Sequence, residues 1–242
     1  MRDAYRHFVA EFIGIFALVF VGGGAIMSAP TSGSGLLGVA VAHGLILAIM
    51  VSATMRISGH LNPAVTLGFL VTRRIEPVMA GVYVVAQLLG AMAAAYALKG
   101  IFPADLFEAT RGGGQSVSSA IGTGAAIAVE AIATFFLVFV VFGTAVDPKA
   151  PRVGGFAIGL TIAADILAIG PLTGASMNPA RSFGPAVASG MFEGHLIYWI
   201  GPLIGGVAAA LLYDMLFLPR AAEPVEHGAV KPAGAAPRVH AT

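Results

Sequence analysis

Two short segments carry the residues whose types and spacing point to a specific chemistry. They read Asn62-Pro63-Ala64 and Asn178-Pro179-Ala180. Asn is a favoured N-cap and Pro is favoured at the first helical position, so each triplet predicts the start of a helix. One such triplet is weak evidence of function, because the same residues form ordinary caps and turns. Two copies in matching surroundings are strong evidence.

Other chemistries find no support in the sequence. The chain has no cysteine, which excludes disulfides and thiolate metal sites. No motif places a Ser, a His and an Asp as a nucleophile and its base. Thirteen basic and twelve acidic residues give a net charge of +1, which leaves no excess to neutralise phosphates. We therefore expect no enzyme activity, no cofactor, no metal site and no nucleic-acid partner.

The elements that must position the two triplets lie in a lipid bilayer. Of 242 residues, 57% are hydrophobic and only 10% are charged, whereas soluble domains carry about 25% charged residues. A helix needs about 20 apolar residues to cross the hydrocarbon core. Six runs of that length predict six transmembrane helices: Phe8–Ser28, Leu36–Met55, Val78–Leu98, Ala120–Val146, Val153–Leu172 and His195–Leu218.

Glycine is frequent in these runs, and the chain has 32 in all. Small residues let helix backbones approach closely in a membrane, where lipid supplies no hydrophobic drive for association. Gly155 and Gly159, like Gly201 and Gly205, even have the GxxxG spacing typical of such contacts. The glycines therefore predict close helix packing.

Basic residues in the short loops predict the orientation. If the six runs alternate across the membrane, only Lys99 and Arg111 fall on one side. Ten fall on the other: Arg2, Arg6, Arg56, Arg73, Arg74, Lys149, Arg152, Arg220, Lys231 and Arg238. We expect a multi-pass protein of the plasma (cell inner) membrane with both termini in the cytoplasm. From Pro219 the composition shifts to charge, Pro and Ala, which predicts a disordered cytoplasmic tail over residues 219–242.

The two halves of the chain resemble each other. Glu11 and the residues around it recur around Glu130, and other matched pairs keep an offset between 115 and 119 residues. Because each half contains three full spans, an odd number, the second copy must cross the membrane inverted. This repeat, over about residues 5–99 and 120–218 of one channel domain (1–218), is typical of transport proteins, whose working site lies near the midplane where the repeats meet.

The segments around the triplets, Ser58–Gly68 and Thr173–Gly184, are too apolar for ordinary loops. Each helix start is followed by about ten residues before a break, which spans about half a bilayer. The segments therefore predict two half-helices that meet N-terminus to N-terminus at the midplane, where their positive dipole ends repel cations. Irregular backbone at this depth is tolerated only where it is buried in protein or lines a water-filled cavity, which indicates a pore.

With both triplets, the glutamates Glu11 and Glu130 and the pair Tyr198-Trp199, the chain resembles an aquaporin of the major intrinsic protein family over about residues 5–218. The resemblance implies an all-α membrane fold in which six transmembrane helices and two half-helices form a right-handed bundle. It also implies a homotetramer with one pore per subunit.

The resemblance assigns roles to the central residues. Asn62 and Asn178 would each donate a side-chain amide hydrogen to a passing water. The hydrogens of that water then point away along the pore, which interrupts the hydrogen-bonded chain of waters that proton transfer needs. Glu11 and Glu130 would accept hydrogen bonds from the backbone of the half-helix loops, since buried charges need partners.

The resemblance also implies a second constriction toward the extracellular side. Its four positions fall on His43, Ile166, Ala175 and Arg181, a set similar to plant tonoplast intrinsic proteins, as is the stretch 144–149. Isoleucine in place of an aromatic residue removes a polar contact and widens the opening, while the arginine repels cations. We therefore expect passive permeation of water, and additionally of ammonia, urea or hydrogen peroxide, with protons and ions excluded.

Three functions are alternatives to a water channel. A glycerol facilitator of the same family typically has Asp where Ser182 stands and lacks Tyr-Trp at the start of the sixth span. A coupled secondary transporter also uses inverted repeats and broken helices, but it needs titratable or ion-coordinating groups at the midplane, where this chain has asparagines. A junction protein of the same fold would assemble normally and pass little water.

Two features depart from the simple pattern. Asp165 is an intramembrane acid without a counterpart in the repeat, and it either pairs with a donor or is protonated. The stretch Ser58-Gly59-His60 has one residue fewer than the family usually has before the first triplet. We therefore expect a shortened entry into the first half-helix, upstream of Asn62.

Overall fold

The computed structural model describes residues 2–151 and 153–218. The predicted tail from Pro219 onward, with its three basic residues, and Arg152 lie outside the described residues. All regular elements among the described residues are helical.

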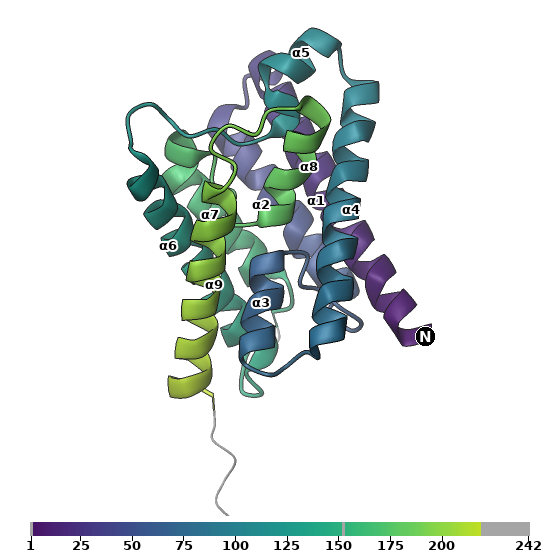
Figure 1. Cartoon of the computed structure of the whole chain (residues 1–242), viewed down its shortest axis with the longest axis vertical. Helices are drawn as coiled ribbons and strands as arrows, with labels where there is room; N and C mark the ends of the chain where they lie inside the picture. Colours follow the sequence, from purple (N-terminus) through teal and green to yellow (C-terminus); the bar gives the residue numbers. More distant parts are fainter. Residues whose placement is uncertain (1, 152, 219–242) are drawn as a thin grey trace, which may run out of the picture.

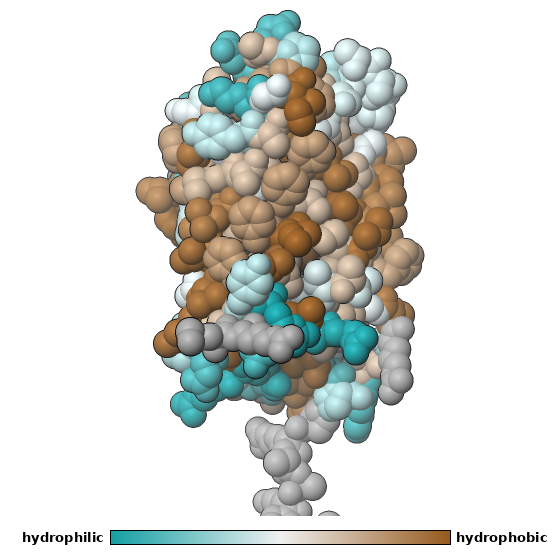
Figure 2. Space-filling model, turned by 90° about the vertical axis from the view of Figure 1, so that its right-hand side faces the viewer, coloured by the Kyte–Doolittle hydropathy of each residue, from teal (hydrophilic) through white to brown (hydrophobic). Residues whose placement is uncertain are grey.

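Six long helices account for the six predicted spans. Each contains a segment long and apolar enough to cross a membrane. They are α1 (Arg2–Ser32), α2 (Gly35–Thr54), α4 (Pro77–Ile101), α6 (Thr123–Val141), α7 (Phe156–Thr173) and α9 (Ile197–Leu216). Figure 2 shows the surface that follows from this composition, a hydrophobic belt between two hydrophilic ends. The predicted all-α membrane fold is confirmed.

Two short helices, α3 (Pro63–Val71) and α8 (Pro179–Ser189), follow the two triplets. With 9 and 11 residues they are about 14 and 17 Å long, or half of a bilayer core. In Figure 1, α3 lies in the lower half of the molecule and α8 in the upper half, between the long helices. They are the two predicted half-helices.

The packing of the two halves is interlocked. In the first half α1 packs against α4, and in the second half α6 packs in the same way against α9. Each half-helix, however, rests mainly on the last long helix of the other half: α3 on α9, and α8 on α4. The start of α1 and the end of α9 point to the same end of the molecule, as an even number of spans requires (Figure 1).

The connection between α4 and α6 contains elements that the hydrophobic pattern did not reveal. They are α5 (Ala104–Ala109) and a single 3-10 turn, η1 (Arg111–Gly113), and they lie at what we call the outer end, the end that carries α5 (Figure 1). Both are too short for a period of 3.6 residues to be visible in the sequence. In η1, Gly113 has φ +80° and lies directly on Gly23 of α1, a conformation and a contact that a side chain would disturb.

Glycine contacts hold the long helices together as expected. A methyl group at Gly159 of α7 would lie 2.7 Å from Cβ and 2.9 Å from N of Ala48 in α2. A methyl group at Gly201 of α9 would lie 2.7 Å from the Ile127 carbonyl oxygen of α6. The backbones of both helix pairs are therefore in contact, which confirms the predicted role of the GxxxG pairs.

Replacing Gly159 by alanine should destabilise the protein. The added methyl group meets backbone atoms of α2, which cannot yield as a flexible side chain would, so we expect a loss of about 1–3 kcal/mol. Thermal unfolding in detergent measures the change. Gly81→Ala in α4 is the matched control, because a methyl group there meets nothing within 4 Å; equal unfolding temperatures for the two variants would contradict the packing argument.

Candidate functional site

The N-terminal ends of α3 and α8 are tied to each other at the centre of the molecule. Asn62 Nδ2 donates to the Met177 carbonyl oxygen at 2.8 Å, and Asn178 Nδ2 donates to the Leu61 carbonyl oxygen at 2.8 Å. Each asparagine therefore bonds the residue that precedes the other asparagine. The two triplets, 116 positions apart in the sequence, form one reciprocal unit.

Both asparagines also cap their own helices, as predicted. Asn62 Oδ1 accepts from the backbone N of Ala64 at 2.8 Å. Asn178 Oδ1 accepts from the backbone N of Ala180 at 3.0 Å and of Arg181 at 3.2 Å. With the carbonyl oxygen and one amide hydrogen so occupied, the second amide hydrogen of each side chain remains available.

The residues just before the asparagines are strained. Leu61 has φ +50° and Met177 has φ +53°, in the left-handed region that side chains disfavour. Such a conformation persists only where the surroundings hold it. In this protein two buried carboxylates, one in α1 and one in α6, hold it.

Glu11 of α1 holds the first loop. One of its carboxylate oxygens accepts from the Ser58 hydroxyl and from the backbone N of His60 at 2.9 Å. The other accepts from the backbone N of Leu61 at 2.7 Å and from Gln87 Nε2 at 2.7 Å. Glu11 is fully buried, and these donors replace the water that a carboxylate would otherwise need.

Glu130 of α6 holds the second loop in the same way. Its oxygens accept from Thr173 Oγ1 at 2.7 Å, from the backbone N of Ser176 at 2.9 Å and from the backbone N of Met177 at 2.7 Å. Tyr198 of α9 then donates its hydroxyl to the Thr173 carbonyl oxygen at 2.8 Å. These placements match the support that the resemblance implied for Glu11 and Glu130.

The two loops differ by one residue, and the contacts show where. Ser58 corresponds to Thr173, because each hydroxyl donates to the glutamate, and His60 corresponds to Ser176, because each backbone N does so. One residue lies between the first pair and two between the second. The loop that leads into α3 is therefore one residue shorter upstream of Leu61, as expected, while the helix start itself is normal: Asn62 caps α3 as Asn178 caps α8.

One cavity is lined by both asparagines and by all four residues of the expected constriction. Most of its wall is aliphatic, and the polar groups are few. It is lined by Leu18, His43, Leu47, Val51, Gly59, His60, Leu61, Asn62, Val65, Leu137, Val141, Ile158, Ile162, Ile166, Ala175, Ser176, Asn178 and Arg181. A wall of this kind holds a solute only at a few points.

Arg181 and His43 are the two polar residues among the four positions of the expected constriction. Arg181 Nη2 lies 2.8 Å from His43 Nε2, and His43 Nδ1 lies 2.8 Å from the Val39 carbonyl oxygen. Because a carbonyl only accepts, Nδ1 carries the proton and Nε2 accepts from the arginine, which makes the imidazole neutral. Arg181 Nη1 is buried without a hydrogen-bond partner among the described residues. This donor and the positive charge are available to a solute in the cavity.

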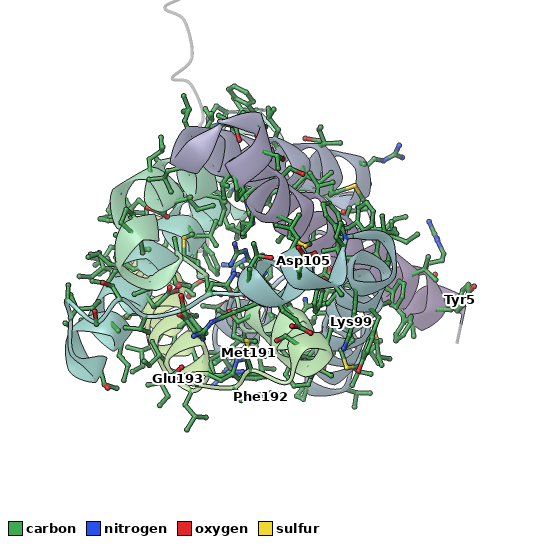
Figure 3. All side chains as sticks on the ribbon, turned by 90° about the horizontal axis from the view of Figure 1, so that it is seen from above. Tyr5, Lys99, Asp105, Met191, Phe192 and Glu193 are labelled. Atoms are coloured by element: carbon green, nitrogen blue, oxygen red, sulfur yellow. The ribbon has the colours of Figure 1, made fainter. Side chains whose placement is uncertain are left out.

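Two basic residues at the outer end bond neighbouring elements. Lys99 Nζ donates to the Ala188 carbonyl oxygen in the last turn of α8 at 2.7 Å, where a cation also suits the negative end of the helix dipole. Arg111 forms an ion pair with Glu193 at 3.4 Å. Seen from above in Figure 3, Lys99 and Glu193 lie on this end together with Asp105 of α5.

Sequence reasoning missed several supporting residues. Ser58 and Thr173 sit at the repeat offset of 115 and could have been found by it. Gln87 donates to Glu11 and, at 3.1 Å, to Thr66 Oγ1, but the repeat places Pro202 at the matching position. No repeat signal therefore points to Gln87. Asp165, which neighbours Ile166, is not among the residues that line the cavity.

Comparisons with known proteins agree with this geometry. The sequence model of the family described as "Major intrinsic protein" matches residues 1–213. Aquaporin TIP4-4 of Zea mays is 45% identical over 224 residues, which cover 88% of this chain and 87% of the relative. Aquaporin TIP2-1 of Arabidopsis thaliana is 44% identical over 224 residues, which cover 88% of each chain.

Among solved structures, the aquaglyceroporin from Plasmodium falciparum is similar. It superimposes with a TM-score of 0.77 at 25% sequence identity, covering 88% of this chain and 96% of the other. The similarity extends over nearly the whole of both chains, so the fold is shared as a unit and not only in its central loops.

Replacing Glu130 by glutamine should weaken the second loop. The new amide NH₂ group faces backbone N–H donors, so one or more of them loses its acceptor, which costs about 1–3 kcal/mol. We expect a lower unfolding temperature in detergent. Glu108→Gln in α5 is the control, because Glu108 is exposed and outside the cavity. Equal stabilities of Glu130→Gln and the native protein would contradict the role of Glu130.

Proposed function

The chain belongs to the major intrinsic protein family, and from that premise we propose that it is a channel for the passive permeation of water across a membrane. The observation that carries the proposal is the cavity lined by both asparagines, which are tied to each other and capped in place. The family and the names of the relatives describe a channel and not an enzyme.

The amide groups at the centre support a mechanism for proton exclusion. Each asparagine has one amide hydrogen left for a passing water, and both lie at the same level of the pore. A water that accepts from both amides directs its own hydrogens away along the pore, so it donates to its neighbours on both sides and has no lone pair left to accept a proton from either. The positive dipole ends of α3 and α8 raise the energy of a cation at the same place.

The constriction supports a wider range of solutes than water alone. The guanidinium of Arg181 donates to Nε2 of His43. Ile166 and Ala175 line the same cavity with apolar side chains. The opening therefore combines one donor group, Arg181, with apolar walls. We propose that ammonia, urea or hydrogen peroxide also pass, since each is small, uncharged and able to accept a hydrogen bond.

The assembly and the membrane are proposals that rest on the resemblance and on the loop charges. We propose a homotetramer in the lipid bilayer with one pore per subunit and with both termini in the cytoplasm. Six apolar helices and the family match support a multi-pass integral membrane protein. Location in the plasma membrane stays a prediction, and the names of the relatives lend it no support.

Purified protein in liposomes should pass water faster than empty vesicles in stopped-flow light scattering. One preparation should be compared for water, ammonia, urea, hydrogen peroxide and glycerol, with glycerol expected to be the slowest. Water flux equal to that of empty vesicles would contradict the proposal and favour a junction role. Glycerol flux above water flux would favour the facilitator, and solute uptake driven by a proton gradient would favour coupled transport.

Removing the charge of Arg181 should weaken ion exclusion while water still passes. Arg181→Met keeps much of the side-chain volume but loses the cation, so proton leakage into vesicles should rise about tenfold or more, equivalent to about 1.4 kcal/mol of barrier. A pH-sensitive dye inside the vesicles measures the leakage. Arg111→Met is the control, because Arg111 lies outside the cavity at the outer end. Equal leakage in the two variants would contradict the role of Arg181.

A further inference from the structure

Asp165 is an acid in the middle of a membrane-spanning helix that the proposed permeation does not use. It is the tenth of the 18 residues of α7 and is only 9% exposed. Its Oδ2 atom is buried and has no hydrogen-bond partner among the described residues. An ionisable residue at this depth is expensive, and its presence calls for a physical explanation.

The position of Asp165 on α7 determines what surrounds it. Ile162 and Ile166 line the cavity, and Gly159 and Ala163 face α2, where both contact Gly44. Successive residues of a helix are 100° apart around its axis. Around α7, the residues that face α2 lie on one side of the cavity-lining residues, and Asp165 lies on the other side. Besides α2, the long helix that packs against α7 is α6. The carboxyl group therefore lies in the seam between α6 and α7, beside the wall of the channel.

No cation faces this seam from the helices that form it. The only titratable group in α6 is Glu130, whose negative charge acts on Asp165, and the only one in α2 is His43. His43 is neutral, because its two ring nitrogens bond Val39 and Arg181. Asp165 itself is the only titratable group in α7. A charged Asp165 would thus have a second carboxylate as its neighbour and no counter-ion in α2, α6 or α7.

From the burial, the unpartnered oxygen and the absence of a cation in these helices, we propose that Asp165 is a proton-binding site in the α6–α7 seam. A buried carboxylate without a partner lowers its free energy most simply by taking up a proton. The neutral acid then packs between the helices without disturbing Glu130. The proton stays at the carboxyl group and does not accompany the solute.

Loss of this proton should reduce permeation. In alkaline solution the group becomes a carboxylate, which repels Glu130 and draws water into the seam. Glu130 holds the loop that carries Ala175, Asn178 and Arg181, so a displacement of Glu130 acts on the constriction directly. The channel is therefore open with the proton bound and restricted without it.

The test is the pH profile of water permeability, which presupposes the proposed function. The native protein in liposomes should lose at least about half of its flux as the medium is raised from about pH 5 to about pH 9, the range in which buried carboxyl groups titrate. Asp165→Asn copies the neutral acid and should keep its flux throughout. Asp105→Asn is the matched control, an exposed acid of α5 at the outer end (Figure 3), and should behave as the native protein. An identical pH profile for Asp165→Asn and the native protein would overturn the proposal.

A second measurement is independent of flux. The infrared difference spectrum between the native protein and Asp165→Asn should show the carbonyl stretch of a protonated carboxylic acid at neutral pH, and the band should vanish in alkaline solution. Its presence in a protein that passes no water would support the proton site and contradict only the proposed permeation. Absence of the band at neutral and mildly acid pH would overturn the proton site itself. If Asp165→Asn does not assemble, Asp165→Ser serves the same comparison.

Discussion

The structure depends on one constraint, that backbone polar groups at the depth of the hydrocarbon core must find partners within the protein. Two loops break the helical pattern at this depth, and each exposes N–H groups that lipid cannot bond. Glu11 and Glu130 accept from those groups, and both are buried at 0% exposure. Burial of a charged carboxylate is tolerated where it accepts several hydrogen bonds. The strained residues Leu61 and Met177 persist because these bonds hold them.

The same constraint explains why the two halves cannot act separately. Each asparagine bonds the carbonyl oxygen of the loop opposite, and each half-helix packs on the last long helix of the other half. Neither loop is therefore fully bonded without its counterpart. The centre of the channel is a rigid unit made by both repeats, and this rigidity fixes the direction of the two free amide hydrogens on which the mechanism relies.

The cavity has its arginine–histidine pair at only one level because the repeat is imperfect. Where the second half has Arg181, the first has Val65, and where the first has His43, the second has Ile158. All four residues line the cavity, but the polar pair meets at one level and the aliphatic residues lie elsewhere. A chain with two identical halves would lack such a pair.

The sequence by itself determined the elements that local composition dictates: the six apolar spans, the half-helices that begin at Asn62 and Asn178, and the inverted order of the halves. Family resemblance added the residues of the constriction. Only the tertiary structure decided which groups meet, because hydrogen bonds such as Asn62 to Met177 join residues 115 positions apart and leave no local pattern. It also showed that Gln87 donates to Glu11, that Asp165 Oδ2 has no hydrogen-bond partner within residues 2–151 and 153–218, and that Asn62 caps α3 normally. Such pairings follow from the geometry of packed helices, which periodicity along one chain does not contain.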